Sequence, residues 1–95
     1  MLDTLLLAIL EETPEQMQSL DSAIAAADVD TARRAAHTVL GNMRTVMAEQ
    51  AMEQAAAVEL LARDADFDSI GEPIETLRNT IKNVLAEITH HRESQ

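Results

Sequence analysis

Apolar residues recur at every third or fourth position along most of this 95-residue chain, which is the spacing of one face of an α-helix. The clearest stripe lies in the C-terminal third and consists of Ile70, Ile74, Leu77, Ile81, Leu85 and Ile88. Ala and Leu, which favour helices, are abundant, and the chain has only two Gly and two Pro. The sequence therefore predicts an all-α fold in which amphipathic helices bury their apolar stripes against one another.

The N-terminal third contains a possible break between two helices. We expect a short first helix over residues 3–12, with Asp3 as its cap. Thr13 is then the N-cap of a second helix, Pro14 its first residue and Gln16 the partner in a capping box. This helix is expected to run to about Ala27. A kinked continuation of the first helix is the alternative.

Asp28 and Asp30 are placed to cap the next helix and to complement its dipole. The end of that helix is ambiguous, because no Pro or second Gly follows Gly41 closely. Thr45 is a candidate N-cap for a further helix that runs to about Arg63, and one unbroken helix is the alternative.

The last helix follows a polar linker over residues 64–69 and has Pro73 in its first turn. The tail after His91 is expected to fray. Together these elements predict a single domain over residues 1–95, folded as an antiparallel up-and-down four-helix bundle with a short extra N-terminal helix.

The composition excludes several classes of function. A net charge of −10 at pH 7 and a single aromatic residue, Phe67, argue against nucleic-acid binding, which needs basic surfaces and stacking side chains. With no Cys, thiolate metal sites are excluded, and a reducing, cytoplasmic setting is expected. The apolar run Leu2–Leu10 is too short to span a membrane and contains Asp3, so direct membrane contact is not expected.

One segment of this acidic chain has no acidic residue. Residues 31–48 contain neither Asp nor Glu, although the chain has 17 such residues, and they include three of its seven basic ones. Helical spacing places Arg33, Arg34, His37, Gly41 and Arg44 on one face of the segment. The opposite face is an apolar stripe formed by Ala32, Ala35, Ala36, Val39, Met43 and Val46. The imidazole of His37 is therefore expected to point outward.

An exposed imidazole presents a nucleophilic ring nitrogen near neutral pH and can accept a phosphoryl group. The three arginines would lower the electrostatic cost of bringing an anionic donor close. The sequence has no Gly-rich nucleotide loop and no carboxylate, Ser or second His placed with His37 to form a hydrolytic triad. It therefore predicts a protein that relays a phosphoryl group without autonomous kinase activity.

The run Ala36-His37-Thr38-Val39-Leu40-Gly41 resembles the Ala-His-x-Leu-Lys-Gly signature of histidine-containing phosphotransfer (HPt) domains. Chain length, helix order and the later Val58-Glu59-Leu60-Leu61 are similar too, especially to the C-terminal HPt domains of bacterial hybrid sensor kinases. The resemblance implies a cytoplasmic phosphorelay protein, in some cases the cytoplasmic part of a membrane-bound kinase. It also implies receiver domains and a hybrid sensor kinase as partners, with Mg²⁺ on the receiver and no cofactor on this chain.

By this resemblance His37 is the phosphoacceptor and Gly41 the clearance residue beside it. Two positions depart from the family pattern: the usual Lys three residues after the His is Leu40, and the Gly commonly found ten after it is Met47. Arg44 is expected to replace the missing Lys, with Arg33 and Arg34 as further support. Leu40 lies at the border of the apolar stripe, either at the edge of the core or exposed. We expect it to form a partner-docking floor with Gly41.

Two other functions compete with the relay. The first is a helical docking module with the same fold that no longer accepts phosphate, because Leu40 replaces the Lys. The second is a ferritin-like metal site, suggested by Glu87-x-x-His90 on a helix, although the required second pair is absent from the sequence. His37 could also be an ordinary surface histidine without a function. Gly41 makes this less attractive, because a glycine within a helix costs about 1 kcal/mol relative to alanine and needs a reason such as access to the ring or close packing.

Overall fold

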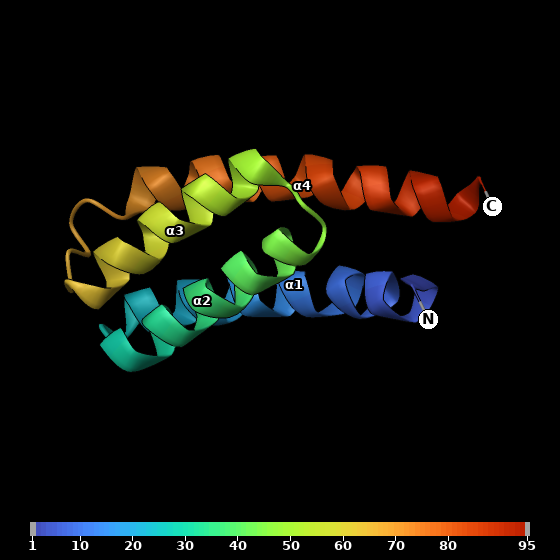
Figure 1. Cartoon of the computed structure of the whole chain (residues 1–95). Helices are drawn as coiled ribbons and strands as arrows, with labels where there is room; N and C mark the ends of the chain where they lie inside the picture. The colour runs from blue at the N-terminus through green and yellow to red at the C-terminus, as the bar shows by residue number, and fades with distance from the viewer. Residues whose placement is uncertain (1, 95) are drawn as a thin grey trace.

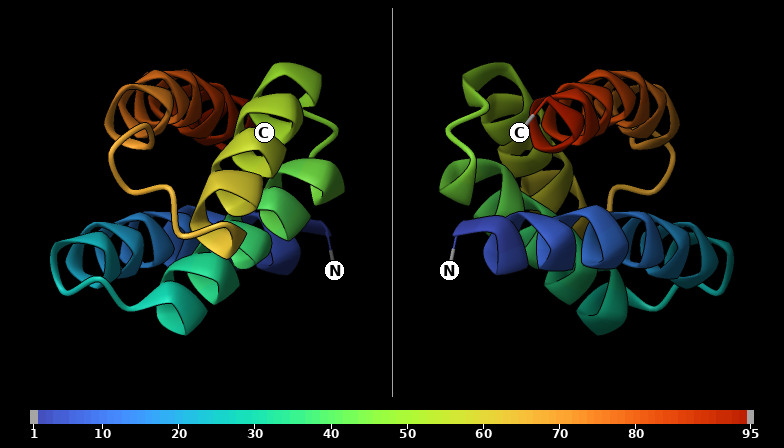
Figure 2. Two further views of the ribbon diagram at one scale, coloured as in Figure 1. Left: turned by 90° about the vertical axis from the view of Figure 1, so that its left-hand side faces the viewer. Right: turned by 90° about the vertical axis from the view of Figure 1, so that its right-hand side faces the viewer.

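The computed structural model describes residues 2–94 of the chain as four helices: α1 (Leu2–Ala25), α2 (Val29–Thr45), α3 (Glu49–Arg63) and α4 (Gly71–Glu93). Figure 1 shows them running alternately in opposite directions, and Figure 2 shows the four helices from the two ends of the bundle. The described residues include no strand. The prediction of an all-α, antiparallel four-helix bundle is confirmed.

The core forms along the apolar stripes that the sequence pattern predicts. In α2 the buried residues are Ala32, Ala35, Ala36, Val39, Leu40 and Met43. The same core contains larger buried side chains, such as Leu20 of α1 and Leu77 of α4. Small alanines on α2 and α3 let these helices approach closely, and α2 packs against both α1 and α3.

The separate short N-terminal helix is absent, because α1 continues without a break through Pro14. Thr13 lies inside this helix rather than capping a new one. Its side chain is fully buried, and its hydroxyl oxygen accepts a hydrogen bond of 3.2 Å from the side-chain amide of Asn42 on α2. Ile9 and Met17, on either side of Pro14, both belong to the core. Burial of this shared stripe keeps the helix continuous, as the alternative interpretation of the sequence predicts.

The start of α2 agrees with its sequence. Asp28 is the N-cap, and its carboxylate accepts hydrogen bonds from the backbone N–H of Thr31 at 3.2 Å and from its hydroxyl at 2.7 Å. These bonds, the hydroxyl first, hold the pKa of the Asp28 carboxyl below its ordinary value.

The turn between α2 and α3 differs from the prediction that Thr45 is an N-cap. The Thr45 hydroxyl instead donates to the carbonyl oxygen of Gly41, and α3 begins only at Glu49. Met47 takes the left-handed conformation that ends α2, with φ of 58°. Its N–H donates to the Arg44 carbonyl, while the N–H of Ala48 donates to the Met43 carbonyl. This pair of bonds is the Schellman motif, whose left-handed position glycine usually occupies.

Replacing Met47 with glycine is therefore expected to stabilise the fold by about 1 kcal/mol, because glycine adopts this φ without a Cβ clash. Met47 is 82% exposed, so the loss of its side chain removes little packing. Met47→Ala is the matched control, since it also removes the side chain but keeps the Cβ. Urea unfolding of the two variants measures the difference, and equal stability would contradict the backbone argument.

The far end of the bundle is tied by an ion pair. The guanidinium of Arg92 donates to the carboxylate of Asp3 at 2.7 Å, which lowers the pKa of Asp3 and raises that of Arg92. Asp3 thus pairs with α4, and α4 continues to Glu93. The tail after His91, which the sequence predicts to fray, is helical as far as Glu93, and this contact joins it to the first turn of α1. No helix within residues 2–94 has the length and apolar character needed to cross a membrane.

Candidate functional site

His37 lies in the middle of α2 on the face that points away from the core. Its side chain is 68% exposed, whereas its neighbour Ala36 is fully buried. The alternation follows from the helical rotation of about 100° per residue, which puts the apolar stripe and His37 on opposite sides. The structure therefore presents the imidazole to solvent, as predicted.

A carboxylate from the neighbouring helix holds this imidazole. Nδ1 of His37 lies 2.9 Å from Oε2 of Glu59, and the Glu59 side chain is only 24% exposed. A carboxylate accepts hydrogen bonds, so this contact places the ring hydrogen on Nδ1. Nε2 then carries the lone pair, and it has no hydrogen-bond partner among residues 2–94. The pair fixes both the tautomer and the orientation of the ring.

This contact corrects the sequence analysis, which found no carboxylate placed with His37. Glu59 is 22 residues away along the chain, so only the antiparallel packing of α2 against α3 brings it to the ring. The available signal was an acidic residue on α3 between the core residues Val58 and Ala62. No intrinsic property of Glu59 separates it from Glu53, which is exposed on the same helix.

The three arginines predicted to support His37 are all exposed on α2. Arg34 donates from Nε to the backbone carbonyl of Asp30 at 3.4 Å. Arg33 and Arg44 form no ion pair with any residue in the described part of the chain. Their guanidinium groups therefore remain available to an approaching anion.

The sequence analysis missed a fourth arginine, Arg63, which lies at the end of the bundle where α2 begins. Figure 1 shows that the end of α3 and the start of α2 lie at the same end of the bundle. Arg63 ends α3 there and is 61% exposed; its only ion pair in residues 2–94 is with the adjacent Asp64 at 3.2 Å. The sequence shows that Arg63 lies one helical turn after Glu59. It does not link Arg63 to the site, because it does not reveal the contact between Glu59 and His37.

Gly41 lies one helical turn after His37 and is partly exposed. A Cβ placed on it would meet no atom within 4 Å outside the local backbone. Close packing therefore does not explain this glycine. Side chains on a helix point back over the preceding turn, so a long side chain at position 41 would extend toward His37. The geometry is consistent with the predicted clearance role.

The predicted docking role of Leu40 is not supported. Leu40 is only 8% exposed and belongs to the core. Of the two positions that the sequence allowed, the edge of the core is the correct one, because α2 is packed between α1 and α3 and its border residues are covered. Leu40 thus offers little surface to a partner, and the position occupied by Lys in the resembled signature carries no charge here.

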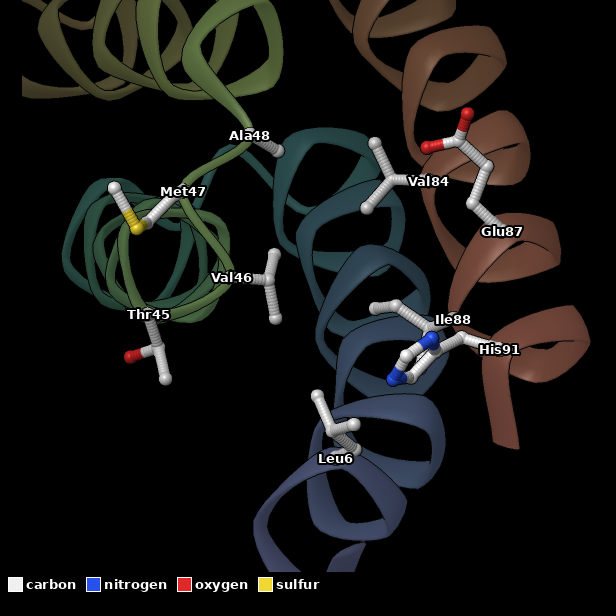
Figure 3. Close-up of a pocket in the computed structure, with 9 residues that line it drawn as sticks. All are labelled: Leu6, Thr45, Val46, Met47, Ala48, Val84, Glu87, Ile88 and His91. Carbon is white, nitrogen blue, oxygen red and sulfur yellow. The ribbon is translucent and has the colours of Figure 1, made fainter. Parts of the chain in front are cut away.

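A hollow lies at the C-terminal end of α2, between the α2–α3 turn and the ends of α1 and α4. It measures about 400 Å³, and Figure 3 shows its lining residues, among them Leu6, Val46 and Ile88. Glu87 and His91 also line it. Within residues 2–94 no group of three or more His, Asp or Glu side chains is arranged to hold a metal ion, so the suggested Glu87-x-x-His90 site gains no further ligands.

One of three comparisons with known proteins finds a match. The family model described as the Hpt domain matches residues 4–87, which is most of the chain. No curated protein and no solved structure matches the chain.

Proposed function

The chain belongs to the Hpt domain family, and we propose that His37 is its phosphoacceptor. Histidine phosphotransfer within phosphorelays is the function of this family. The observation that carries the assignment to His37 is the exposed imidazole whose Nδ1 is held by Glu59 at 2.9 Å. This arrangement leaves Nε2 as the nucleophile.

The transfer step balances without a separate proton carrier. The lone pair of Nε2 attacks the phosphorus of an aspartyl phosphate, the Nε2–P bond forms, and the P–O bond to the aspartate breaks. The aspartate leaves as a carboxylate, and the proton stays on Nδ1. The ring gains positive charge as the bond forms, and the Glu59 carboxylate stabilises that charge through its hydrogen bond. The reverse step delivers the phosphoryl group to a second aspartate.

Arginines on α2 supply the positive charge that this step needs. The phosphoryl group is anionic and the aspartate leaves as a carboxylate, while this chain has a net charge of −10 at pH 7. Arg33, Arg34 and Arg44 provide guanidinium groups along the face that carries His37, and the segment around them has no acidic residue. We assign to Arg44 the role of the absent Lys, since Leu40 is buried.

Hpt domains act with receiver domains. We propose that the donor is the receiver domain of a hybrid sensor kinase and that the acceptor is a response regulator, both in the cytoplasm. Mg²⁺ is expected on the receiver, where it would assist cleavage of the aspartyl phosphate. The chain itself supplies the histidine and the surrounding charges.

The proposal is tested by mixing the domain with receiver domains charged by acetyl phosphate in the presence of Mg²⁺. We expect label on the wild-type domain that is stable to base and labile to acid, which is the behaviour of a phosphohistidine. Binding of a charged receiver without any label on the domain would instead favour the docking module. Incubation of a separate sample with phosphoramidate, a small phosphoryl donor, tests the reactivity of the imidazole without any docking.

Replacing Glu59 with glutamine is expected to slow transfer from a receiver about ten- to a hundredfold. The amide keeps a similar shape but loses the negative charge that stabilises the ring, and it can donate to Nδ1, which favours the wrong tautomer. Glu53→Gln on the same helix is the matched control, because Glu53 is exposed and has no hydrogen bond or ion pair to another side chain in residues 2–94. Transfer reactions quenched at successive times give the transfer rate of each variant. A rate in Glu59→Gln equal to that of Glu53→Gln would show that the carboxylate does not assist.

A further inference from the structure

Exposed apolar side chains are few on the described part of this protein, and one of them adjoins the site. The large hydrophobic residues that are exposed there are Leu5, Leu7, Met47 and Leu60. Leu5 and Leu7 lie near the start of α1, and Met47 lies in the α2–α3 turn. Leu60 alone lies on α3, directly after the residue that binds His37, and it is 49% exposed.

Leu60 lines a shallow hollow on the outer side of α3. The hollow has a volume of about 220 Å³ and is lined by Ala56, Glu59, Leu60 and Arg63. Glu59 therefore belongs both to this hollow and to the hydrogen bond with His37, which makes the two surfaces continuous. We call Ala56, Leu60 and Arg63 the Leu60 patch.

We propose that the Leu60 patch is the apolar anchor on which the receiver domain docks during transfer. The proposal rests on the proposed function, because it assumes that a receiver must reach Nε2 of His37. Any protein that brings an aspartate to this nitrogen covers the surface around the ring. With Leu40 buried, Leu60 is the large apolar side chain beside the site that such a partner can bury.

The charge around the patch fits the same partner. Arg63 borders Leu60 and is exposed, and its contact with Asp64 is a surface pair between adjacent residues, which competes weakly with another anion. Arg33 and Arg34 belong to the first half of α2, which begins at the end of the bundle where α3 ends (Figure 1). A receiver presents acidic side chains and a phosphoryl group around its aspartate. An apolar contact flanked by arginines therefore complements the rim of such a site.

The test compares Leu60→Ser with Leu5→Ser, because Leu5 has the same side chain, a similar exposure of 46% and a position on another helix. One sample of each variant is labelled with phosphoramidate, and a separate unphosphorylated sample is assayed for transfer from the charged receiver that gives the fastest transfer to the wild type. We expect Leu60→Ser to lower kcat/KM for transfer about tenfold through a higher KM. Labelling by phosphoramidate should stay at the wild-type rate, and Leu5→Ser should match the wild type in both assays.

Two results would overturn the proposal without affecting the role of His37. The first is a KM in Leu60→Ser equal to that in Leu5→Ser. The second is a wild-type dimer, seen by sedimentation, that Leu60→Ser converts to a monomer with no change in transfer, which would make the patch a self-association surface. Absence of label on wild-type His37 with both donors would instead overturn the proposed function, and the docking proposal with it.

Discussion

Replacing His37 with glutamine is expected to abolish phosphoryl acceptance, both from a charged receiver and from phosphoramidate. The glutamine amide has no nucleophilic lone pair, so the rate should fall to less than about one thousandth of the wild-type value. The fold should survive, because His37 is 68% exposed and contributes nothing to the core. Circular dichroism and thermal unfolding of the variant check this.

His90→Gln is the matched control for this substitution. His90 is also an exposed histidine on a helix, but it lies near the end of α4, far along the chain from the site. We expect the His90→Gln variant to be labelled at the wild-type rate. Label that persists on His37→Gln and disappears from His90→Gln would place the phosphoacceptor on α4 and refute the assignment.

The second large effect is expected at Gly41. Replacing it with leucine should slow transfer from a receiver about a hundredfold, because the side chain would extend back over the turn that carries His37 and displace the incoming phosphoryl group. The same change removes a glycine from the interior of α2, so the variant should be more stable than the wild type by about 0.5 to 1 kcal/mol. Loss of function would thus accompany a gain in stability.

Gly41→Ala separates these two effects. A Cβ at this position meets no atom within 4 Å, so alanine should stabilise the helix by about 1 kcal/mol and leave transfer near the wild-type rate. Urea unfolding and receiver-transfer kinetics on both variants provide the comparison. Equal transfer by the leucine and alanine variants would show that Gly41 does not serve access to His37.

The helical architecture was predictable because it depends on local pattern. The stripe from Ile70 to Ile88 predicts α4, and the stripe opposite His37 predicts the buried face of α2. Asp28 was recognisable as an N-cap because its cap bonds go to Thr31, only three residues away. In each case the chemistry that decides the structure lies within one or two helical turns.

The errors occurred where tertiary packing outweighed a local signal. Thr13 and Pro14 form a good helix start, yet Thr13 is buried against Asn42 and α1 continues through both. Thr45 is a plausible cap, but its hydroxyl donates back to Gly41, and the helix end is set by Met47 in a left-handed conformation usually given to glycine. Around Pro14 the burial of Ile9 and Met17 outweighs the capping signal, whereas the end of α2 is set by the backbone hydrogen bonds of Met47 and Ala48.

The site divides in the same way. His37 and the arginines of α2 share one helix, so their common face followed from spacing alone. Glu59 and Leu60 join the site through the packing of α3 on α2, and only the register of the two helices identifies them. The position of Leu40 was left open for the same reason, because a residue at the edge of an apolar stripe is buried or exposed according to its neighbouring helix.

The most direct test of the account is the location of the phosphoryl group in the phosphorylated domain. Uniformly ¹⁵N-labelled protein can be charged from a receiver and examined by NMR for coupling between phosphorus and the ring nitrogens of each histidine. We expect phosphorus on Nε2 of His37 and a proton retained on Nδ1 beside Glu59. Phosphorus on Nδ1 of His37, or on any other residue, would contradict it.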